Sequence, residues 1–310
     1  MKVLITGGAG YTGSLLVPLL LGAGHEVSVV DNLLFNQTTH LPYFYDNNFS
    51  FTKGDIRDKS TMMPLVNNAD MIVHLAAIVG EPSCRVNPGL AREVNADASK
   101  LLNELRGKKP LIYASTGSNY GKVEGICTEE TPAKPLSIYA ETKLEAEKGF
   151  EKSGNVIRYR FATGFGLSPR LRLDLLVNDF CYQAVNGGNL IIYQKDVKRT
   201  FIHVRDMARA LLHGIENFNK MKDNLYNVGH ESLNHTKKEL VERIRKFYPK
   251  LYVHYADIGQ DPDQRDYEVS YAKMRGAGFE TVVTLNQGIK EMLKAFPSIK
   301  LHNPYTNFQG

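Results

Sequence analysis

The start of the chain constrains the fold most, because it joins a short apolar run to closely spaced glycines. Residues 3–5 are Val-Leu-Ile, glycines follow at positions 7, 10 and 13, and residues 14–21 then show a helical apolar spacing. The order strand, glycine turn, helix is the fingerprint of a dinucleotide-binding unit. In that unit Gly7 permits the tight turn, Gly10 lets the backbone approach a pyrophosphate, and Gly13 lets the helix pack on the strand. The pyrophosphate is expected at the helix N-terminus, where free N–H groups favour an anion.

An acidic residue ends the next predicted strand, which covers residues 26–31. Asp31 lies 18 residues after Gly13. A carboxylate at this point accepts hydrogen bonds from the adenosine ribose hydroxyls and repels a 2′-phosphate. Since residues 32–39 contain no Lys or Arg, we predict NAD, not NADP, as the cofactor. The alternative is an ordinary surface aspartate.

Four more strands are predicted, at residues 49–54, 70–77, 110–115 and 156–161. Helical or polar segments separate them, which is typical of an α/β fold built on a doubly wound parallel (Rossmann) sheet. The third strand is followed by Asp55 and Ile56, which are candidates for contacts to adenine. The fourth ends in small residues, which leave room for a ligand at the carboxyl edge of the sheet. His74 precedes that strand tip, so we expect it to have a structural role.

The overall composition excludes several classes of protein. The chain has 310 residues, of which 43% are hydrophobic and 23% charged, so we expect a soluble globular protein with a large hydrophobic core. The net charge is +5 but its basic residues are spread out, which argues against nucleic-acid binding. The cysteines at positions 84, 127 and 181 are few and widely spaced, which fits reduced thiols in a cytoplasm and no metal site. No apolar run approaches the ~18–20 residues that span a membrane, and the first residues already form a core strand, so we expect no signal peptide.

Candidate catalytic residues follow the fifth strand. The segment 115–121 places several hydroxyl groups at the strand tip, and Tyr139 and Lys143 share one helix face because they are four residues apart. A fixed ammonium favours the phenolate form of a nearby tyrosine. Such a tyrosine can take a proton from a hydroxyl while hydride leaves the same carbon. This pair alone could be a surface helix pair, but its place after the glycine turn and Asp31 favours catalysis.

The pattern changes after the sixth strand. Short strands are predicted at 190–193, 199–204 and 225–229, and helices at 205–213, 236–247 and 285–296. We therefore predict an NAD-binding domain over residues 1–165, to which residues 195–230 return. Residues 166–300 would mainly form a smaller α/β substrate lobe, and residues 301–310 a polar tail.

Together these motifs resemble those of the extended short-chain dehydrogenases/reductases, in the NAD-dependent nucleotide-sugar epimerase/dehydratase family. The resemblance runs from residue 1 to about 296. The segments that carry it are Thr6–Gly13, Asp31–Leu33, Gly54–Ile56, His74–Ala77, Val94–Asn95, Ser115–Gly121, Tyr139–Lys143, Arg199–Asp206, Tyr226–Gly229 and Arg265–Asp266.

The resemblance implies an enzyme that oxidises C4 of a GDP- or UDP-linked sugar. Thr116 would hydrogen-bond the sugar O4, Tyr139 would remove its proton, and Lys143 would bind the nicotinamide ribose. The implied NAD-binding residues are Gly7, Gly10, Tyr11, Thr12, Gly13, Asp31, Asn32, Asp55, Ile56, Leu75, Ala76, Ala77, Asn95, Tyr139 and Lys143. The implied substrate-binding residues are Ser118, Thr163, Arg199 and Arg265, with the arginines on the diphosphate. Family members often dimerise through helices that here correspond to about 89–106 and 139–152.

Several departures bear on the reaction. Gly117 and Ser118 stand where 4,6-dehydratases carry an acidic pair, so dehydration by that route is not expected. Thr163 replaces an Asn that is usual in 4-epimerases, and Val79 lies near the place of a Lys found in many of them. The block 168–180 resembles a branch that includes GDP-heptose 4-dehydrogenases. The sequence therefore predicts a 4-epimerase or a 4-dehydrogenase; the alternative is a noncatalytic NAD-binding redox sensor or RNA-associated protein.

Overall fold

A seven-stranded parallel sheet forms the centre of the computed structural model, which describes residues 1–256 and 266–299. Its strand order is β11-β7-β5-β4-β1-β2-β3. The strands are β1 (Lys2–Thr6), β2 (Glu26–Asp31), β3 (Phe49–Lys53), β4 (Met71–His74), β5 (Leu111–Thr116), β7 (Val156–Phe161) and β11 (Leu225–Val228). Each strand pairs in parallel with its neighbours. The doubly wound Rossmann sheet predicted from the sequence is therefore confirmed.

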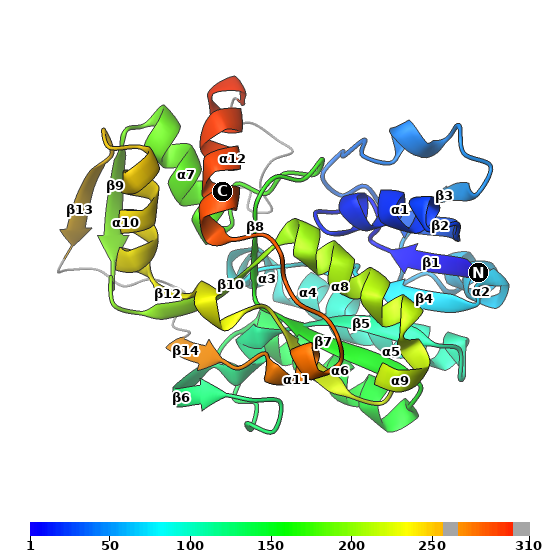
Figure 1. The fold of residues 1–310 in the computed structure, drawn as a ribbon. Coiled ribbons are helices and arrows are strands. Elements are labelled where there is room, and N and C mark those ends of the chain that lie inside the picture. Colours follow the sequence, from blue (N-terminus) through cyan, green and yellow to red (C-terminus); the bar gives the residue numbers. More distant parts are fainter. Residues whose placement is uncertain (257–265, 300–310) are drawn as a thin grey trace.

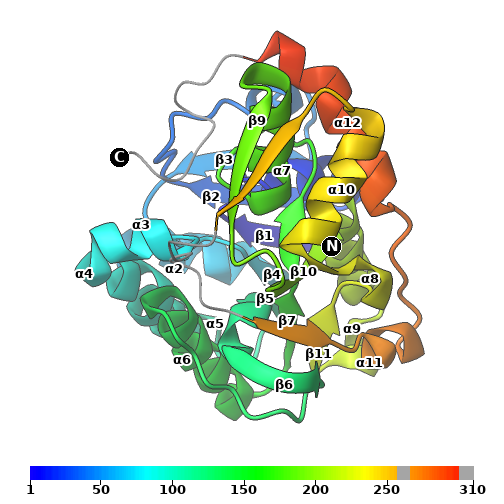
Figure 2. The same cartoon turned by 90° about the vertical axis from the view of Figure 1, so that its left-hand side faces the viewer.

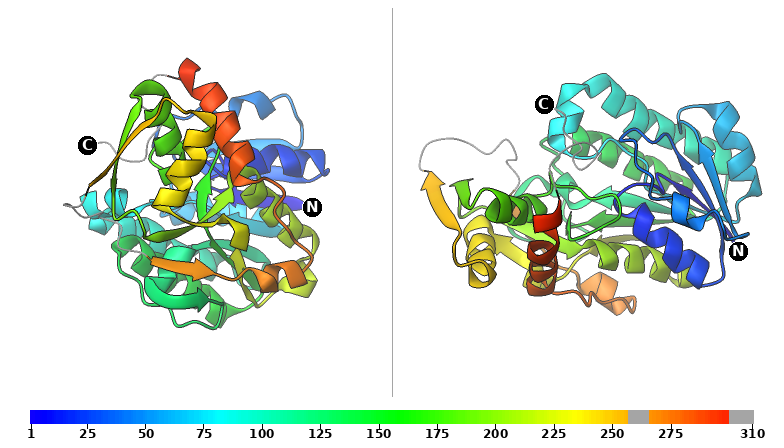
Figure 3. Two further views of the ribbon diagram at one scale, coloured as in Figure 1. Left: turned by 60° about the vertical axis from the view of Figure 1, so that its left-hand side comes forward. Right: turned by 90° about the horizontal axis from the view of Figure 1, so that it is seen from above.

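Helices cover both faces of this sheet (Figure 1 and the right-hand view of Figure 3). In β1 the side chains of Val3 and Ile5 pack into one core cluster, and Leu4 into the cluster on the opposite face. This alternation follows from the two-residue repeat of a strand. The first cluster includes α1 (Gly13–Gly22) and α8 (Val204–Glu216), and the second includes α2 (Lys59–Asn68), α5 (Ala98–Arg106) and α6 (Ile138–Ser153).

The helix predicted over residues 89–106 is not continuous. It divides into α4 (Pro88–Arg92), a π-helical turn (Glu93–Asp97) and α5, and a short helix, α3 (Glu81–Val86), precedes it. Asn95 lies in the π turn, where its side chain accepts a hydrogen bond from the Ile78 N–H at 2.8 Å and donates to the Ile78 carbonyl at 3.0 Å. Single π turns inside helices are frequent at functional sites. Here the turn holds the backbone that follows β4.

The fourth strand is shorter than predicted, because pairing ends at His74 and residues 75–77 leave the sheet. His74 is buried, and its two ring nitrogens lie 2.6 Å from Thr6 Oγ1 and 2.9 Å from Ser99 Oγ. Burial, with the nearby Lys143 ammonium, lowers the pKa of His74 to about 3. The predicted structural role of His74 agrees with these contacts.

The second half of the chain builds a smaller α/β region beside the sheet (Figure 2). A three-stranded sheet contains β8 (Thr163–Phe165), β10 (Lys198–His203) and β12 (Asn234–Thr236), while β9 (Asn189–Tyr193) pairs with β13 (Tyr252–Ala256) and β6 (Lys122–Cys127) pairs with β14 (Asp266–Val269). The helices of this region are α7 (Leu176–Asn186), α10 (Lys237–Phe247) and α12 (Leu285–Ala295), while the short helices α9 (Phe218–Met221) and α11 (Ala272–Gly276) pack on the first core cluster of the large sheet. A separate apolar cluster joins α7, α10 and α12 to β9 and β10. Strands β6, β8, β12, β13 and β14 had not been predicted.

None of the helices in residues 1–256 and 266–299 combines the length and the apolar character needed to cross a lipid bilayer.

Candidate active site

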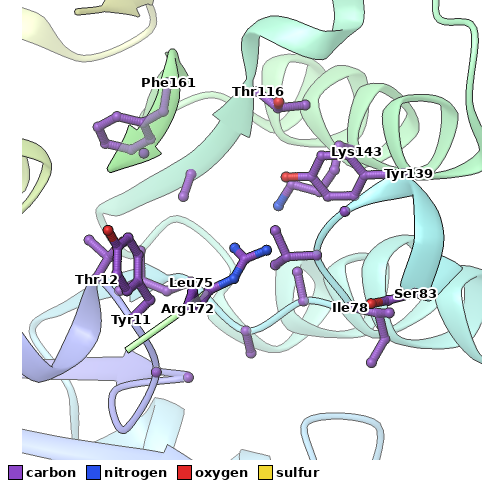
Figure 4. A pocket seen from close by; sticks show the side chains of 18 of the residues that line it. Tyr11, Thr12, Leu75, Ile78, Ser83, Thr116, Tyr139, Lys143, Phe161 and Arg172 are labelled. Atoms are coloured by element: carbon purple, nitrogen blue, oxygen red, sulfur yellow. The ribbon is translucent and has the colours of Figure 1, made fainter. Parts of the chain in front are cut away.

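A cavity of about 710 Å³ lies at the carboxyl edge of the large sheet. It runs from Asp31 past the glycine turn to Tyr139 and Lys143, and residues of the second half of the chain, such as Arg172 and Arg199, form its opposite wall. Figure 4 shows part of this lining from close by. Ligands of open α/β sheets bind at this edge, so the cavity is the candidate active site.

The glycine turn fits the backbone approach that a dinucleotide requires. Gly7 has a φ of +72°, and a β-carbon there would lie 2.7 Å from the backbone nitrogen of Ala76. A β-carbon at Gly13 would lie 2.6 Å from the Cα of Gly8. Helix α1 begins at Gly13, and the Thr12 side chain makes no capping hydrogen bond. The Ser14 and Leu15 N–H groups already donate to the Gly10 and Thr12 carbonyls (3.0 and 3.2 Å), so an anion such as a pyrophosphate would be held by the backbone of the turn before them and by the positive end of the helix dipole.

Asp31 ends β2 at the far end of the cavity from Tyr139. It accepts hydrogen bonds from the backbone N–H groups of Ala9 (3.1 Å) and Leu33 (2.9 Å) and from Gln37 Nε2 (3.1 Å). Burial raises the pKa of the Asp31 carboxyl, and the two backbone hydrogen bonds oppose that shift. A carboxylate has about four acceptor sites, so a held Asp31 can still accept from a ribose hydroxyl. The neighbouring Asn32 also lines the cavity.

Asp55 and Ile56, which were predicted to contact adenine, follow β3 and line the same end of the cavity. The Asp55 carboxylate is already bound by Arg57, whose Nε lies at 3.0 Å and Nη2 at 2.7 Å. These hydrogen bonds lower the pKa of Asp55. An adenine amino group would therefore share this carboxylate with Arg57.

Thr116, Tyr139 and Lys143 meet at the other end of the cavity (Figure 4). Thr116 ends β5, where its Oγ1 lies 3.0 Å from Ser118 Oγ and accepts from the Ser118 N–H at 3.1 Å. Tyr139 and Lys143 lie in the first turns of α6, which begins after Ser137 and is capped by the Ser137 hydroxyl. The capped helix and the strand tip thus bring together the three residues predicted to be catalytic.

Lys143 lies in a largely apolar setting, with Nζ 4.2 Å from the centroid of the Tyr113 ring. Burial lowers the pKa of Lys143 to about 7, while Glu147 and Cys84 oppose that shift. Glu147 is one turn further along α6 and is itself buried. A carboxylate in that position partly offsets the cost of burying the ammonium.

Glu147 is the centre of a buried polar network behind the site. Its carboxylate accepts from Arg160 Nη2 (2.6 Å), Arg160 Nε (3.1 Å) and Asn119 Nδ2 (3.2 Å), and also from the Ser115 hydroxyl. Arg160 belongs to β7 and stacks on Tyr120, with its Cζ 4.7 Å from the ring centroid. Since Ser115 immediately precedes Thr116, this network ties α6 to the strand tip that carries Thr116.

The predicted substrate-binding residues lie on the same cavity. Ser118 follows β5, Thr163 begins β8, and Arg199 belongs to β10. Arg199 is buried, and its Nη1 donates to the Lys198 carbonyl at 3.0 Å. The fourth predicted residue, Arg265, lies outside the described residues.

The predicted cofactor-binding residues mostly line the cavity too. Gly7, Gly10, Tyr11, Thr12, Leu75, Ala76 and Ala77 do so. Asn95 does not; it is buried beneath and holds Ile78, which is a lining residue.

Sequence reasoning missed Arg170, Arg172, Asp174, Gln37 and Glu147. The first three line the cavity from a segment more than 130 residues after Asp31. The signal that could have found them is the alternation Arg-Leu-Arg-Leu-Asp over residues 170–174, with charged groups at every second position of a segment that otherwise reads as apolar.

Over residues 1–256 and 266–299, no three or more His, Cys, Asp or Glu side chains are grouped so that they could hold a metal ion.

Comparison with known proteins identifies the family. The sequence profile of the "NAD dependent epimerase/dehydratase family" matches residues 3–229. The chain belongs to this family. It is therefore an enzyme of the extended short-chain dehydrogenase/reductase type, as the sequence motifs predicted, and NAD, predicted from the glycine turn and Asp31, is confirmed as the cofactor.

The names of similar proteins describe several different reactions on nucleotide sugars. UDP-glucuronic acid decarboxylase 1 of Danio rerio is 28% identical over 95% of this chain and 72% of its own. UDP-N-acetyl-alpha-D-glucosaminuronate decarboxylase of Bacillus cytotoxicus is 28% identical over 96% of this chain and 98% of its own. The structure of Thermus thermophilus UDP-glucose 4-epimerase in complex with NAD superposes with a TM-score of 0.83 at 25% identity, covering 96% of this chain and 99% of that one. These relatives catalyse different reactions, so membership of the family does not by itself identify the reaction of this chain.

Proposed function

We propose that this protein oxidises C4 of a nucleotide-diphosphate sugar with NAD, as a 4-epimerase or as a 4-dehydrogenase that releases the 4-keto sugar. The observation that carries the proposal is the meeting of Thr116, Tyr139 and Lys143 in the cavity that the glycine turn lines. The relatives named above support a nucleotide sugar as the substrate. UDP and GDP are both candidates for the nucleotide.

Each of the three catalytic residues has its own role in the transfer of the O4 proton. The Tyr139 oxygen takes the O4 proton as general base, and the Thr116 hydroxyl holds O4 by a hydrogen bond. Lys143 binds the nicotinamide ribose and, as an ammonium, favours the phenolate form of Tyr139. Bound NAD supplies the acceptor for the hydride that leaves C4. Gly7, Gly10, Thr12 and Gly13 would hold its pyrophosphate, and Asp31 its adenosine ribose.

The segment after β5 argues against a dehydratase. Elimination of water needs a general acid and a general base beside the 4-keto sugar. Residues 115–121 contain no Asp or Glu, and Ser118, which stands where the dehydratases carry an acidic residue, hydrogen-bonds Thr116. This arrangement supports C4 oxidation without dehydration.

Thr163, Ser118 and Arg199 line the wall where the second half of the chain meets the catalytic end. We assign them to the sugar and its diphosphate, together with Arg265. A guanidinium fork matches phosphate oxygens, and the buried Arg199 is well placed to neutralise a diphosphate. Residues 166–300 would then mainly bind substrate, while residues 1–165 bind NAD.

Two further proposals concern the state of the protein. A homodimer would form through the helices of residues 89–106 and 139–152, by the packing of two helices from each subunit. Sedimentation that shows a monomer at working concentration would contradict this. We also propose a cytoplasmic location, because the three cysteines are free and buried, as expected of reduced thiols.

The test is turnover of a panel of UDP- and GDP-linked sugars by the NAD-loaded protein, with product identification by mass spectrometry and NMR. One sugar should give a C4 epimer or a 4-keto product, and Tyr139→Phe should abolish its formation. Tyr45→Phe is the control, because Tyr45 is 86% exposed and outside the cavity. Product formation by Tyr139→Phe at the parent rate would refute the assigned base. A panel without any turnover would favour a noncatalytic NAD-binding protein.

A further inference from the structure

Residues 166–174, which we call the strap, are hydrogen-bonded to the glycine turn. The Tyr11 hydroxyl donates to the Gly166 carbonyl at 2.8 Å, and the Ser168 hydroxyl donates to the Tyr11 carbonyl at 2.7 Å. Ser14, in the first turn of α1, has its Oγ 2.9 Å from Ser168 Oγ. A segment from the second half of the chain is thus fixed directly onto the turn expected to hold the pyrophosphate.

The strap brings two buried arginines to the cavity. Arg170 is 2% exposed and Arg172 is 8% exposed, and both line the cavity wall. The Arg170 guanidinium lies over the Phe35 ring, with Cζ 4.2 Å from the centroid. Burial lowers the pKa of Arg170 to about 10, and the nearby carboxylates of Asp174 and Asp31 oppose that shift. Since Phe35 and Asp31 border the adenosine end, Arg170 belongs to that end.

Arg172 lies further toward the catalytic end. Its Nη2 is 2.5 Å from Asp174 Oδ2 and its Nε is 3.3 Å from Asp174 Oδ1. A β-carbon at Gly80 would be 3.8 Å from Arg172 Nη2. In Figure 4 the guanidinium projects into the cavity between Tyr11 and the pair Tyr139–Lys143. The Asn178 side chain also donates to the Arg172 carbonyl at 2.8 Å, which fixes the backbone.

We propose that Arg172 binds the pyrophosphate of NAD, held in position by Asp174. Arg172 lies two residues beyond the adenosine-side Arg170, at most ~7 Å along the chain, and its guanidinium lies between Tyr11 of the glycine turn and the Tyr139–Lys143 pair (Figure 4). The contacts of Tyr11 and Ser14 place the same stretch of strap beside the N-terminus of α1. A planar guanidinium gives paired hydrogen bonds to phosphate oxygens, and Asp174 fixes its orientation before the ligand arrives.

This role would complete the cofactor site from the second half of the chain. The N-terminus of α1 binds a pyrophosphate through backbone N–H groups but brings no full charge. Val79 and Gly80, on the loop after β4 that borders the cavity, carry no positive charge that could bind a phosphate. The inference rests on NAD as the cofactor and not on the proposed C4 chemistry, so either can fail alone.

The test compares ligands that contain or lack the pyrophosphate. NAD is removed from the protein, and NAD, ADP-ribose and adenosine are titrated by displacement of fluorescent NADH. Arg172→Gln should weaken NAD and ADP-ribose roughly 10- to 100-fold, the size of a lost charge-assisted hydrogen bond, and change adenosine by less than about threefold. Arg170→Gln is the matched control on the same strap. It should weaken all three ligands by a similar factor.

A second variant guards against a folding defect. Arg172→Gln removes the guanidinium that binds the Asp174 carboxylate, so the double variant Arg172→Gln/Asp174→Asn is measured beside it. The same selective loss of NAD and ADP-ribose is expected, with an unchanged circular-dichroism spectrum. Unchanged ADP-ribose affinity in both variants would overturn the proposal. So would an equal loss of affinity for adenosine, since the effect of Arg172 would then not be specific to the pyrophosphate.

Discussion

Replacing Glu147 by Gln tests how much the buried Glu147–Arg160 ion pair, which lies behind Thr116 and Lys143, contributes to the stability of the fold. Glu147 and Arg160 are both buried, and two guanidinium nitrogens bind the carboxylate. Gln keeps the shape of the side chain but removes the charge, so Arg160 stays buried without a counter-ion. Breaking a buried pair from one side costs about 3–5 kcal/mol.

The expected effect on melting follows from the size of the protein. At about 2.1 cal/mol/K per residue, a chain of 310 residues unfolds with an entropy of about 0.65 kcal/mol/K. A loss of about 3–5 kcal/mol then lowers Tm by about 5–8 °C. The assay is calorimetry of the NAD-free protein, supported by urea denaturation to check that unfolding is reversible.

The chain offers a matched control one turn further along α6. Glu151 pairs with Arg158 at 2.6 Å; the Arg158 side chain is 7% exposed, but the Glu151 side chain is 57% exposed and lies in water. Because water can replace the carboxylate at that exposed end, we expect Glu151→Gln to cost about 1 kcal/mol, the upper size of a surface pair, and to shift Tm by no more than about 1.5 °C. The double variant Glu147→Leu/Arg160→Met should recover part of the loss, because it removes both charges. If Glu147→Gln and Glu151→Gln lower Tm by the same amount, the buried Glu147–Arg160 pair does not contribute the stability assigned to it.

Three further predictions concern the cofactor end and the catalytic lysine. The pKa of Asp31 is raised by burial, so NAD affinity should fall as the pH drops through that raised pKa and the anionic acceptor is protonated; Asp31→Asn should bind NAD more weakly, discriminate less against NADP, and lack this pH dependence in titrations. The pKa of Lys143 is lowered from 10.5 to about 7 by burial, so the unfolded chain binds more protons between these values and stability should rise with pH across that window; Lys143→Met should abolish the rise in denaturant titrations from pH 7 to 10, and an equal slope in parent and variant would contradict it. Gly7→Ala should weaken NAD at least tenfold by displacement titration, because φ is +72° and the added carbon would meet the Ala76 nitrogen at 2.7 Å; Gly24→Ala, also at positive φ but with open space around it, should leave NAD affinity unchanged.

The first half of the fold could be predicted because local signals and topology agree there. Buried parallel strands such as β1 and β5 read as short apolar runs, and the glycine turn marks where strand becomes helix. Parallel strands end at one edge of the sheet, so Asp31, Thr116 and the glycine turn had to face one cavity. The four-residue spacing predicted Tyr139 and Lys143 on one face of a helix, which is α6 in the structure.

The second half could not be read in the same way. Strands β8 and β12 have three residues each, too few for a periodic pattern, and β14 pairs with β6 across more than 130 residues of sequence. The π turn at Glu93–Asp97 keeps a helical pattern of apolar residues, so sequence periodicity does not reveal it. Arg172 and Glu147 depend on such long-range packing: one reaches the cavity through the strap, and the other meets Arg160 only when α6 docks on β7.

The fate of the hydrogen on C4 tests the central claim most directly. A nucleotide sugar that turns over is prepared with deuterium at C4 and incubated with the NAD-loaded protein for less than one turnover, and the nicotinamide is then analysed by mass spectrometry after denaturation. The account predicts deuterium in the reduced nicotinamide with the parent protein and none with Tyr139→Phe. Product that forms with its C4 deuterium lost to water, and with none in the nicotinamide, would contradict hydride transfer from C4.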